Sequence, residues 1–432
     1  MYQNDAFQIN EKGHLEIGGC DTVQLAKEYG TPLYIMDEET IRNNCRLYRN
    51  SMEEFYGGNG MVLYASKAFS VKEMYRIVMQ EGLGIDVVSG GELYTALSVG
   101  FPAEKIYFHG NNKTPEELEM AMKAGVGYIV ADSREELSLL NFIAGSLGVK
   151  QPILFRIKPG IDAHTHSFVQ TGHIDCKFGT VLENGDSLEF AKIASRQPNL
   201  KLVGVHCHIG SQIFDEKPFL LAAERMMDFV VQVRDTLGIT LEKLNLGGGF
   251  GIRYTQEDQP IAYNEYMKRI SQAMKRIAEE RNIPLPFILM EPGRSIVGEA
   301  GATLYTVGSV KTIPDVRTFV SVDGGMGDNP RYILYQAEYE MLIANKANQE
   351  KDTTVTVAGR CCESGDLLGE NIKLQKTEAG DLLAVLSTGA YHYSMASNYN
   401  RIPRPAVVSV KTGSSRLIVR RESYEDIIRN DI

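Results

Sequence analysis

Hydrophobic and polar positions follow a repeating strand–helix rhythm from about residue 61 onward. Continuous apolar runs, typical of parallel strands buried on both faces, are separated by segments with helical spacing. We expect each of the first seven strands to be followed by a helix. The predicted strands are residues 61–65, 84–88, 105–109, 128–131, 153–157, 202–206, 244–247 and 287–290.

Two of the intervening segments have well-marked helix ends. In "TPEELEMAMKAG", Thr114 is the expected N-cap, Pro115 occupies the first turn and Gly125 ends the helix. Ser133 and Gly148 have the same places in "SREELSLLNFIAGSLG". Both segments therefore predict amphipathic helices between buried strands.

Eight successive β/α units predict a closed (β/α)8 barrel, and an open doubly wound sheet is the competing arrangement. The open sheet would more often begin with a glycine-rich turn after its first strand. Here that turn is "ASKAFS", which lacks the G-x-G-x-x-G spacing. The pattern thus favours the barrel.

After about residue 295 the pattern changes to Val-, Thr- and Ile-rich runs at short intervals, such as "TLYTVGSVKTI" and "RPAVVSVKTG". Runs of this kind with turn residues between them predict an all-β domain. The first 35 residues also contain strand-like runs ("HLEIGG", "TPLYIMD") that could join it. We therefore expect a barrel over residues 36–296 and a β domain built from residues 1–35 and 297–432.

Composition narrows the classes of partner. The chain of 432 residues is 43% apolar and 23% charged, and its net charge is −10, without clusters of basic and aromatic residues. Nucleic acid and anionic membrane surfaces are therefore poor partners. The polar N-terminus lacks the apolar core of a signal peptide, and no apolar run is long enough to span a bilayer. Six scattered cysteines do not form a disulfide framework, so we expect reduced thiols in a cytoplasm.

The unusual side chains stand where predicted strands end, which is the functional face of such a barrel. Lys67 directly follows the first strand and either extends to solvent or forms a Schiff base as a desolvated lysine. His206 and His208 end the sixth strand and could bind a metal only with a third ligand.

A histidine-rich loop follows the fifth strand. Its spacing fits no structural zinc pattern, and a mobile lid is an equally good interpretation. Its residues of interest are His164, His166, His173 and Cys176.

Glycine-rich turns follow the seventh and eighth strands in "NLGGGFG" and "MEPGRS". Backbone N–H groups in such turns approach anions closely, and barrels commonly bind phosphate there, although a tight turn alone would look the same. With Arg294 nearby and Lys67 on the first strand, the set suggests a phosphorylated cofactor held through a Schiff base. Glu291 could then keep a pyridine nitrogen protonated.

The motifs "YASKAF", "HCHIGSQ", "NLGGGFG", "EPGR", "DGGMGDNPR" and "CCESGD" occur in order between about residues 30 and 410. Together they resemble those of the pyridoxal-phosphate-dependent decarboxylases of the alanine-racemase fold type, the ornithine/arginine/diaminopimelate decarboxylase family, and most of all its diaminopimelate branch. The resemblance implies a (β/α)8 barrel with a C-terminal β domain and pyridoxal 5'-phosphate as cofactor.

The resemblance also implies roles for individual residues. Lys67 carries the cofactor, His208 stacks on its ring, and Cys362 is the proton donor, while Cys361 only packs. The other residues implied for the cofactor are Asp86, Arg156, Ser211, Gly248, Gly249, Glu291, Gly293, Arg294 and Tyr391. Those implied for the substrate are Arg294, Arg331, Tyr335, Glu363 and Tyr391.

The implied reaction is decarboxylation of meso-2,6-diaminopimelate to L-lysine and CO2, the last step of lysine biosynthesis. Glu363 suits the distal ammonium of that substrate, and an arginine suits its distal carboxylate. The implied assembly is a homodimer in which the partner subunit supplies Cys362 and Glu363. Decarboxylases of ornithine, arginine, D-lysine or carboxynorspermidine, an amino-acid racemase, and a non-catalytic pyridoxal-phosphate-binding homologue are the alternatives.

Overall fold

The computed structural model describes residues 5–161 and 175–432, so His164, His166 and His173 of the histidine-rich loop lie outside the described residues. The chain forms two compact units. The barrel unit comprises Asn44–Gly251 and Pro260–Gly293, and the β unit comprises Met1–Asn43, Ile252–Gln259 and Arg294–Ile432.

Parallel strands of the barrel unit form a closed ring, which confirms the predicted (β/α)8 barrel. The ring closes because β5 pairs with both β13 and β6, and β8 pairs with β9. A short strand, β10 (Thr180–Val181), adds to the side of β9. The ring strands are β5 (Gly60–Ala65), β6 (Gly84–Val87), β7 (Ile106–Phe108), β8 (Tyr128–Ala131), β9 (Gln151–Lys158), β11 (Leu200–His206), β12 (Lys243–Asn245) and β13 (Phe287–Met290).

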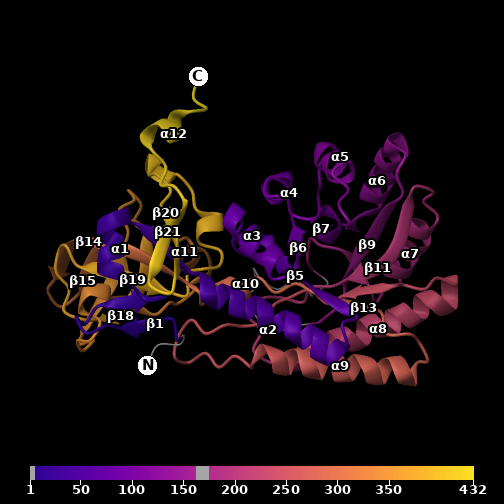
Figure 1. Ribbon diagram of the computed structural model, residues 1–432, viewed down its shortest axis with the longest axis horizontal. Helices are drawn as coiled ribbons and strands as arrows, with labels where there is room; N and C mark the ends of the chain where they lie inside the picture. The colour runs from indigo at the N-terminus through magenta and orange to yellow at the C-terminus, as the bar shows by residue number, and fades with distance from the viewer. Residues whose placement is uncertain (1–4, 162–174) are drawn as a thin grey trace. The chain divides into compact units, whose positions relative to one another are not determined.

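Helices surround the outside of these strands (Figure 1). The predicted ends are confirmed at two of them: Thr114 forms a capping box with Glu117, and Gly148 takes the left-handed conformation after the next helix. The helices are α3 (Lys72–Gln80), α4 (Gly90–Leu97), α5 (Pro115–Lys123), α6 (Arg134–Leu147), α7 (Asp186–Ser195), α8 (Lys217–Leu237) and α9 (Tyr263–Glu280). Helix α2 (Glu38–Tyr56) crosses the boundary between the two units in the sequence.

The interior of the ring is filled by side chains. Six of the eight ring strands, all except β6 and β12, contribute one cluster of buried apolar residues, and bulky residues of this kind make a barrel interior a packed core rather than a pore. The cluster consists of Leu63, Tyr107, Val130, Leu154, Val203 and Leu289. The polar groups at the carboxyl ends of the strands therefore lie at the end of a packed apolar interior.

The β unit is built around a sheet in the order β18-β17-β15-β14-β4-β20-β21, with β19 pairing to β14 and β16 to β19. Strand β4 (Leu33–Asp37) pairs with β14 and β20, which confirms that the N-terminal run "TPLYIMD" joins this sheet. The run "HLEIGG" instead contributes β2 (Leu15–Ile17) to a separate sheet with β1 (Phe7–Ile9) and β3 (Cys20–Asp21). The remaining strands are β14 (Gly301–Ile313), β15 (Arg317–Val322), β16 (Met341–Ile343), β17 (Thr353–Ala358), β18 (Leu367–Leu374), β19 (Leu382–Leu386), β20 (Ala406–Lys411) and β21 (Ser414–Val419).

Short helices complete the β unit: α1 (Thr22–Tyr29), α10 (Arg294–Val297), α11 (Arg331–Tyr335) and α12 (Tyr424–Ile428). Across residues 5–161 and 175–432, no helix combines the length and the apolar character needed to cross a membrane.

Candidate active site

Polar side chains gather at the carboxyl ends of the barrel strands. Lys67 lies in a 3-10 turn, η1 (Ser66–Ala68), directly after β5, and Asp86 lies near the end of β6. His206 ends β11, and Glu291 follows β13. Because the ring is closed and parallel, these residues all belong to the same end of the barrel.

Glu291 is the centre of a buried polar network. Its Oε1 accepts a hydrogen bond from Asn245 Nδ2 at 2.6 Å, and its Oε2 accepts one from His206 Nε2 at 3.0 Å. His109 Nε2 lies 2.8 Å from the same Oε1. The two imidazole rings meet edge to face with centroids 4.7 Å apart. Burial by itself raises the pKa of Glu291, but contacts with the two histidines outweigh it and hold that pKa well below its ordinary value.

Asp86, Lys67 and His208 form a second group. Burial, and then the charge of Glu291, raise the pKa of Asp86 well above its ordinary value, while the charge of Lys67 opposes the rise. Burial and the charge of Lys67 hold the pKa of His208 well below its ordinary value. His208 is therefore neutral, and its Nδ1 accepts a hydrogen bond from the backbone N–H of Gly248 at 3.3 Å.

The glycine-rich turns bring backbone close to backbone. A Cβ atom on Gly248 would stand 2.1 Å from the carbonyl oxygen of Glu291, and one on Gly249 would stand 2.4 Å from that of Gly210. Gly249 also has a φ of +114°, a conformation that side chains rarely adopt. At Gly293 the nearest heavy atom would be 2.8 Å away. These positions require glycine, and such turns can present N–H groups to an anion.

Two further predicted residues lie on the same strands or just after them. Arg156 lies on β9, where its guanidinium stacks at 4.1 Å from the ring centre of Phe178, and burial lowers its pKa. Ser211 follows β11 by a few residues and is half-buried. The barrel unit thus brings together at one end all the barrel residues implied for the cofactor.

These residues fit pyridoxal 5'-phosphate. An ionised Glu291 matches a protonated ring nitrogen, and the glycine turns match a phosphate. Asp86 Oδ1 is buried and has no hydrogen-bond partner among the described residues, as a group turned toward a bound ligand would be.

In the β unit, two arginines face one tyrosine ring. The guanidinium carbon of Arg294 lies 4.7 Å from the ring centre of Tyr391, and that of Arg331 lies 5.4 Å from it. Arg331 also stacks on Tyr335 at 4.8 Å and donates a hydrogen bond from Nε to Tyr339 at 2.8 Å. Tyr391 has a φ of +66°, and backbone strain of this kind often marks a functional position. Paired guanidinium groups suit carboxylate or phosphate ligands.

The loop of residues 361–366 has an anchored backbone, and the side chains of residues 362–365 are exposed. Buried Asp366 accepts hydrogen bonds from the N–H groups of Met326 at 2.6 Å and Cys361 at 2.7 Å. The N–H of Cys362 donates to Asn400 Oδ1 at 2.7 Å. The side chains of Cys362 and Glu363 are exposed, whereas the Arg331 side chain is buried.

Cys361 differs from its neighbour Cys362. It is partly buried, and burial together with the charge of Asp366 raises the pKa of its thiol to about 11. The two adjacent cysteines therefore have separate environments.

The donor atoms of His109, His206 and Glu291 lie within 4.8 Å of one another and could in principle hold a metal ion. Asn245, however, points an N–H donor at the same carboxylate, and His206 already donates to it. A cation at this place would meet those hydrogen atoms. We therefore assign the cluster to the cofactor end of the barrel rather than to a metal.

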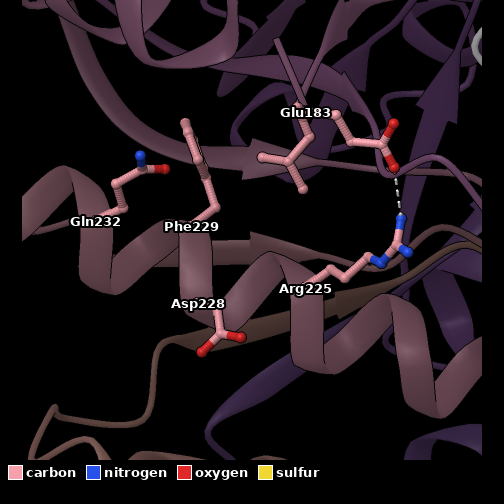
Figure 2. Close-up of a pocket in the computed structure, with 6 residues that line it drawn as sticks. Glu183, Arg225, Asp228, Phe229 and Gln232 are labelled. Carbon is pink, nitrogen blue, oxygen red and sulfur yellow. Dashed lines mark hydrogen bonds and ion pairs between the residues drawn. The ribbon is translucent and has the colours of Figure 1, made fainter. Parts of the chain in front are cut away.

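A separate cavity of about 440 Å³ lies beside helix α8 (Figure 2). Its one arginine, Arg225, is engaged by Glu183 at 3.1 Å and by the carbonyl oxygen of Gly160 at 3.1 Å. Leu182, Asp228, Phe229 and Gln232 complete the lining. Arg225 is paired with Glu183, Asp228 is paired with Arg281, and no histidine, cysteine, serine or lysine is among the described residues of the lining, so we place the chemistry at the strand ends instead.

Sequence reasoning did not identify several residues of these networks. His109 and Asn245 surround Glu291, and Tyr254 accepts a hydrogen bond from Arg294. His109 stands where a predicted strand ends, which is the one signal that the sequence gives for it, whereas Asn245 lies inside the strand predicted over residues 244–247. Asp366 is the last residue of "CCESGD", and the resemblance implies no role for it.

Comparison with known proteins agrees with this geometry. Residues 38–298 match the family model described as "Pyridoxal-dependent decarboxylase, pyridoxal binding domain". The chain is 52% identical to a diaminopimelate decarboxylase from Bacillus methanolicus, covering 98% of each chain, and 50% identical to one from Bacillus subtilis, covering 100% of this chain and 98% of the other. The crystal structure of diaminopimelate decarboxylase from M. jannaschii in complex with L-lysine is 38% identical, with a TM-score of 0.90 over 100% of this chain and 99% of that one.

The family match covers the barrel and the Glu291 network, and the relatives cover both units. The chain therefore belongs to the family of pyridoxal-dependent decarboxylases that includes the diaminopimelate decarboxylases.

Proposed function

We propose that this chain is a pyridoxal 5'-phosphate-dependent carboxy-lyase that converts meso-2,6-diaminopimelate to L-lysine and CO2, the last step of lysine biosynthesis. The observation that carries this proposal is the 52% identity, over 98% of each chain, to a protein named diaminopimelate decarboxylase. The M. jannaschii relative, whose complex contains L-lysine, supports it, because L-lysine is the expected product.

The barrel, which we assign to residues 36–296, would hold the cofactor. Lys67 would bind it covalently, and His208 would cover one face of its ring. When bound, pyridoxal phosphate supplies an electron-withdrawing ring that accepts the electron pair of the breaking Cα–carboxylate bond. Glu291, which is ionised in its buried network, would hold the proton on the ring nitrogen.

The phosphate would be held by N–H groups of the glycine turns, with Ser211 and Arg294 as side-chain donors. Asp86 and Arg156 would border the ring. The closely packed turns support this assignment. Their glycines have no side chain that would keep an anion away from the backbone N–H groups. All of these groups are positioned by strand ends or short turns, which favours a rigid site.

The β domain, residues 1–35 and 297–432, would choose the substrate by its far end. Arg331, with Tyr335 and Tyr391, would contact the distal carboxylate, and Glu363 would contact the distal ammonium. Lysine and ornithine lack that carboxylate, so they would leave a buried guanidinium without its anion. The buried Arg331 side chain supports this assignment.

Cys362 would return a proton to Cα from the partner subunit of a homodimer, with Glu363 beside it. Two observations support this arrangement: the side chains of both residues are exposed on a single chain, and their backbone is held by the bond from the Cys362 N–H to Asn400 and the bond from the Asp366 N–H to the carbonyl oxygen of Glu363. A positioned acid typically contributes about 10²- to 10⁴-fold to the rate.

We also infer a cytoplasmic location. All six cysteines are described and all are free thiols, which suits a reducing compartment. Fractionation of the native cells with a periplasmic and a cytoplasmic marker tests this inference, and recovery with the periplasmic marker would contradict it.

The direct test of the reaction is an assay of purified protein with pyridoxal phosphate and meso-diaminopimelate for L-lysine and CO2. The proposal predicts equal amounts of both products, and peptide mapping after borohydride reduction should find the label on Lys67. Release of CO2 from ornithine or D-lysine but not from diaminopimelate would contradict the substrate. Interconversion of D- and L-amino acids without CO2 would indicate a racemase instead.

A further inference from the structure

The Glu291 carboxylate has three donor groups around it rather than one. Asn245 and His206 donate hydrogen bonds at 2.6 and 3.0 Å, and His109 Nε2 lies 2.8 Å from Oε1. All four side chains are buried, with His206 and Asn245 at 1% and 0% exposure. An ionised carboxylate without partners at such a depth would take up a proton instead. The three donors therefore form a brace, defined as His109, His206 and Asn245.

The charge state of the brace follows from its contacts. Burial lowers the pKa of His206 to about 4, although Glu291 opposes the shift, so this imidazole is neutral at neutral pH. It donates its Nε2–H to Glu291, and its Nδ1 has no partner among the described residues. A second N–H at Nδ1 would be buried without an acceptor, which disfavours the protonated ring. The negative charge thus stays on Glu291.

Backbone contacts fix two members of the brace, Asn245 and His109, independently of each other. Asn245 Oδ1 accepts a hydrogen bond from the N–H of Gly247 at 2.9 Å, so its Nδ2 has to face Glu291. The N–H of His109 donates to the carbonyl of Val87 at 2.8 Å, which ties the end of β7 to β6. The brace is therefore rigid, and through Asn245 it is joined directly to the glycine turn.

The loop after His109 is tied down as well. The buried Lys113 Nζ donates to the carbonyl oxygens of Gly110 at 2.7 Å and Val130 at 2.9 Å, and it lies 2.8 Å from Glu136 Oε1. This ion pair holds the residues after β7 against β8 and α6. Its effect is to keep the His109 ring beside Glu291.

A carboxylate offers about four acceptor positions, of which Asn245 and His206 occupy two, while His109 Nε2 lies 2.8 Å from Oε1 without completing a hydrogen bond to it. At least one position remains for a further donor, and the ring nitrogen of pyridoxal phosphate carries one N–H when protonated. A carboxylate that cannot itself take up a proton leaves that proton on the ring.

We propose that His109, His206 and Asn245 are positioning residues that keep Glu291 ionised and correctly oriented, and that they thereby set how tightly the ring nitrogen of the cofactor is bound. This inference rests on the proposed function, because it takes pyridoxal phosphate as the ligand. It assigns a role to residues that contact Glu291 and need not touch the cofactor.

The test compares two probes on the cofactor-free protein. One is pyridoxal 5'-phosphate, and the other is its 1-deaza analogue, in which a C–H group replaces the ring nitrogen. The variants are His206→Phe and His109→Leu, with His14→Gln as a control that breaks a different histidine–carboxylate pair, that of His14 and Asp21. Binding is measured by absorbance titration, and folding of each variant by circular dichroism.

We expect each brace variant to bind pyridoxal phosphate about 10- to 100-fold more weakly, the loss typical of a buried acceptor that loses a donor. The same variants should bind the deaza analogue within about threefold of wild type, because the lost interaction acts through the ring nitrogen. His206→Gln, which keeps an N–H donor, should recover most of the affinity, and it replaces His206→Phe if that variant does not fold. The control should bind both probes as wild type does.

Equal binding of pyridoxal phosphate by wild type and brace variants would overturn the inference, and so would an equal loss for both probes, which indicates a merely structural role. Both outcomes leave the proposed function intact. A wild-type protein that takes up no pyridoxal phosphate would overturn the proposed function, and this inference with it.

Discussion

Two regions that carry the implied chemistry are built in opposite ways. Around Glu291 in the barrel unit, every side chain of the network is buried and the contacts run from side chain to side chain. In the loop of residues 361–366 of the β unit, the buried Asp366 carboxylate and Asn400 hold the backbone, and the side chains of Cys362 and Glu363 are exposed. The barrel network is thus complete in a single chain, while the loop presents its groups outward.

This difference follows from what each region has to do. An ionised group that tunes a cofactor has to keep its charge. In a buried site of low dielectric, fixed hydrogen-bond donors stabilise that charge. A group that returns a proton to a changing substrate needs a fixed position and a free side chain. The comparison therefore predicts that substitutions in the barrel network alter cofactor binding and stability, whereas substitutions in the loop alter turnover.

The largest expected effect is at Cys362. Cys362→Ala should lower kcat about 10²- to 10⁴-fold, because the proposed acid is removed. Cys361→Ala, its matched control, should keep turnover within about twofold, since that thiol is partly buried and anchored through its backbone. Steady-state assays of CO2 release measure both, and equal losses in the two variants would contradict their separate roles.

The next effect is the acid sensitivity of the barrel network. The pKa of His206 is about 4 in the folded protein and about 6.5 unfolded, so its stabilising contribution is complete above pH 6.5 and is lost as the pH falls toward 4. The loss should amount to roughly 3 kcal/mol of unfolding free energy. The charged and titratable groups that face this ring are Glu291, His109 and Arg156. The pKa of Glu291 is lowered from its ordinary value of 4.5, so the stability that Glu291 contributes is lost only below pH 4.5.

Urea unfolding of the cofactor-free protein between pH 4 and 7.5 measures this loss. In His206→Phe, the unfolding free energy should fall by roughly 3 kcal/mol less than in wild type as the pH is lowered from 7.5 to 4. In His14→Gln, its dependence on pH should be the same as in wild type. An unchanged profile in His206→Phe would show that His206 does not carry the acid sensitivity.

A third effect comes from the glycine turn of the barrel. Gly248→Ala would place its Cβ 2.1 Å from the carbonyl oxygen of Glu291, and relieving that clash should cost about 2 kcal/mol of unfolding free energy and weaken cofactor binding. Gly91→Ala is the control, because Gly91 is exposed at the start of α4 with its nearest contact at 3.7 Å. Thermal unfolding distinguishes the two, and a neutral Gly248→Ala would show that the turn tolerates a side chain.

The smallest effect is at the anchor of the loop. Asp366→Asn replaces one carboxylate oxygen by a donor that faces a backbone N–H, which should cost about 1 kcal/mol of unfolding free energy. Because the anchor positions Cys362 and Glu363, kcat should fall while binding of pyridoxal phosphate stays unchanged. Reduced cofactor binding with normal kcat would reverse the assignment of the two regions.

The barrel could be predicted from the sequence because buried parallel strands leave a continuous apolar signal, and residues 128–131 and 287–290 match β8 and β13. Strand ends were harder to predict where backbone conformation decides them. The strand predicted over residues 244–247 ends at Asn245, since Gly247 takes a φ of +70°. The strand predicted over residues 105–109 is shorter because a 3-10 turn occupies Ala103–Lys105.

The candidate site was only partly predictable for a related reason. Lys67, Glu291 and Arg294 stand in motifs, so the resemblance points to them directly. His109 and Asn245 come from different strands, and nothing in their local sequence shows that both side chains meet Glu291. In the sequence, Asp366 is likewise only one acidic residue of a polar loop. Its role as the acceptor for the N–H groups of Met326 and Cys361 is visible only in the folded chain.

The division of labour between the two regions is tested most directly by mixing two inactive proteins, Lys67→Ala and Cys362→Ala, under conditions that allow subunits to exchange. If the loop serves the partner's barrel, each mixed dimer contains one intact site, and the mixture should recover about a quarter of wild-type CO2 release from meso-diaminopimelate. Size-exclusion chromatography before and after mixing confirms that exchange has occurred. No recovery after complete exchange would contradict the shared site and place both residues in the same chain's active site.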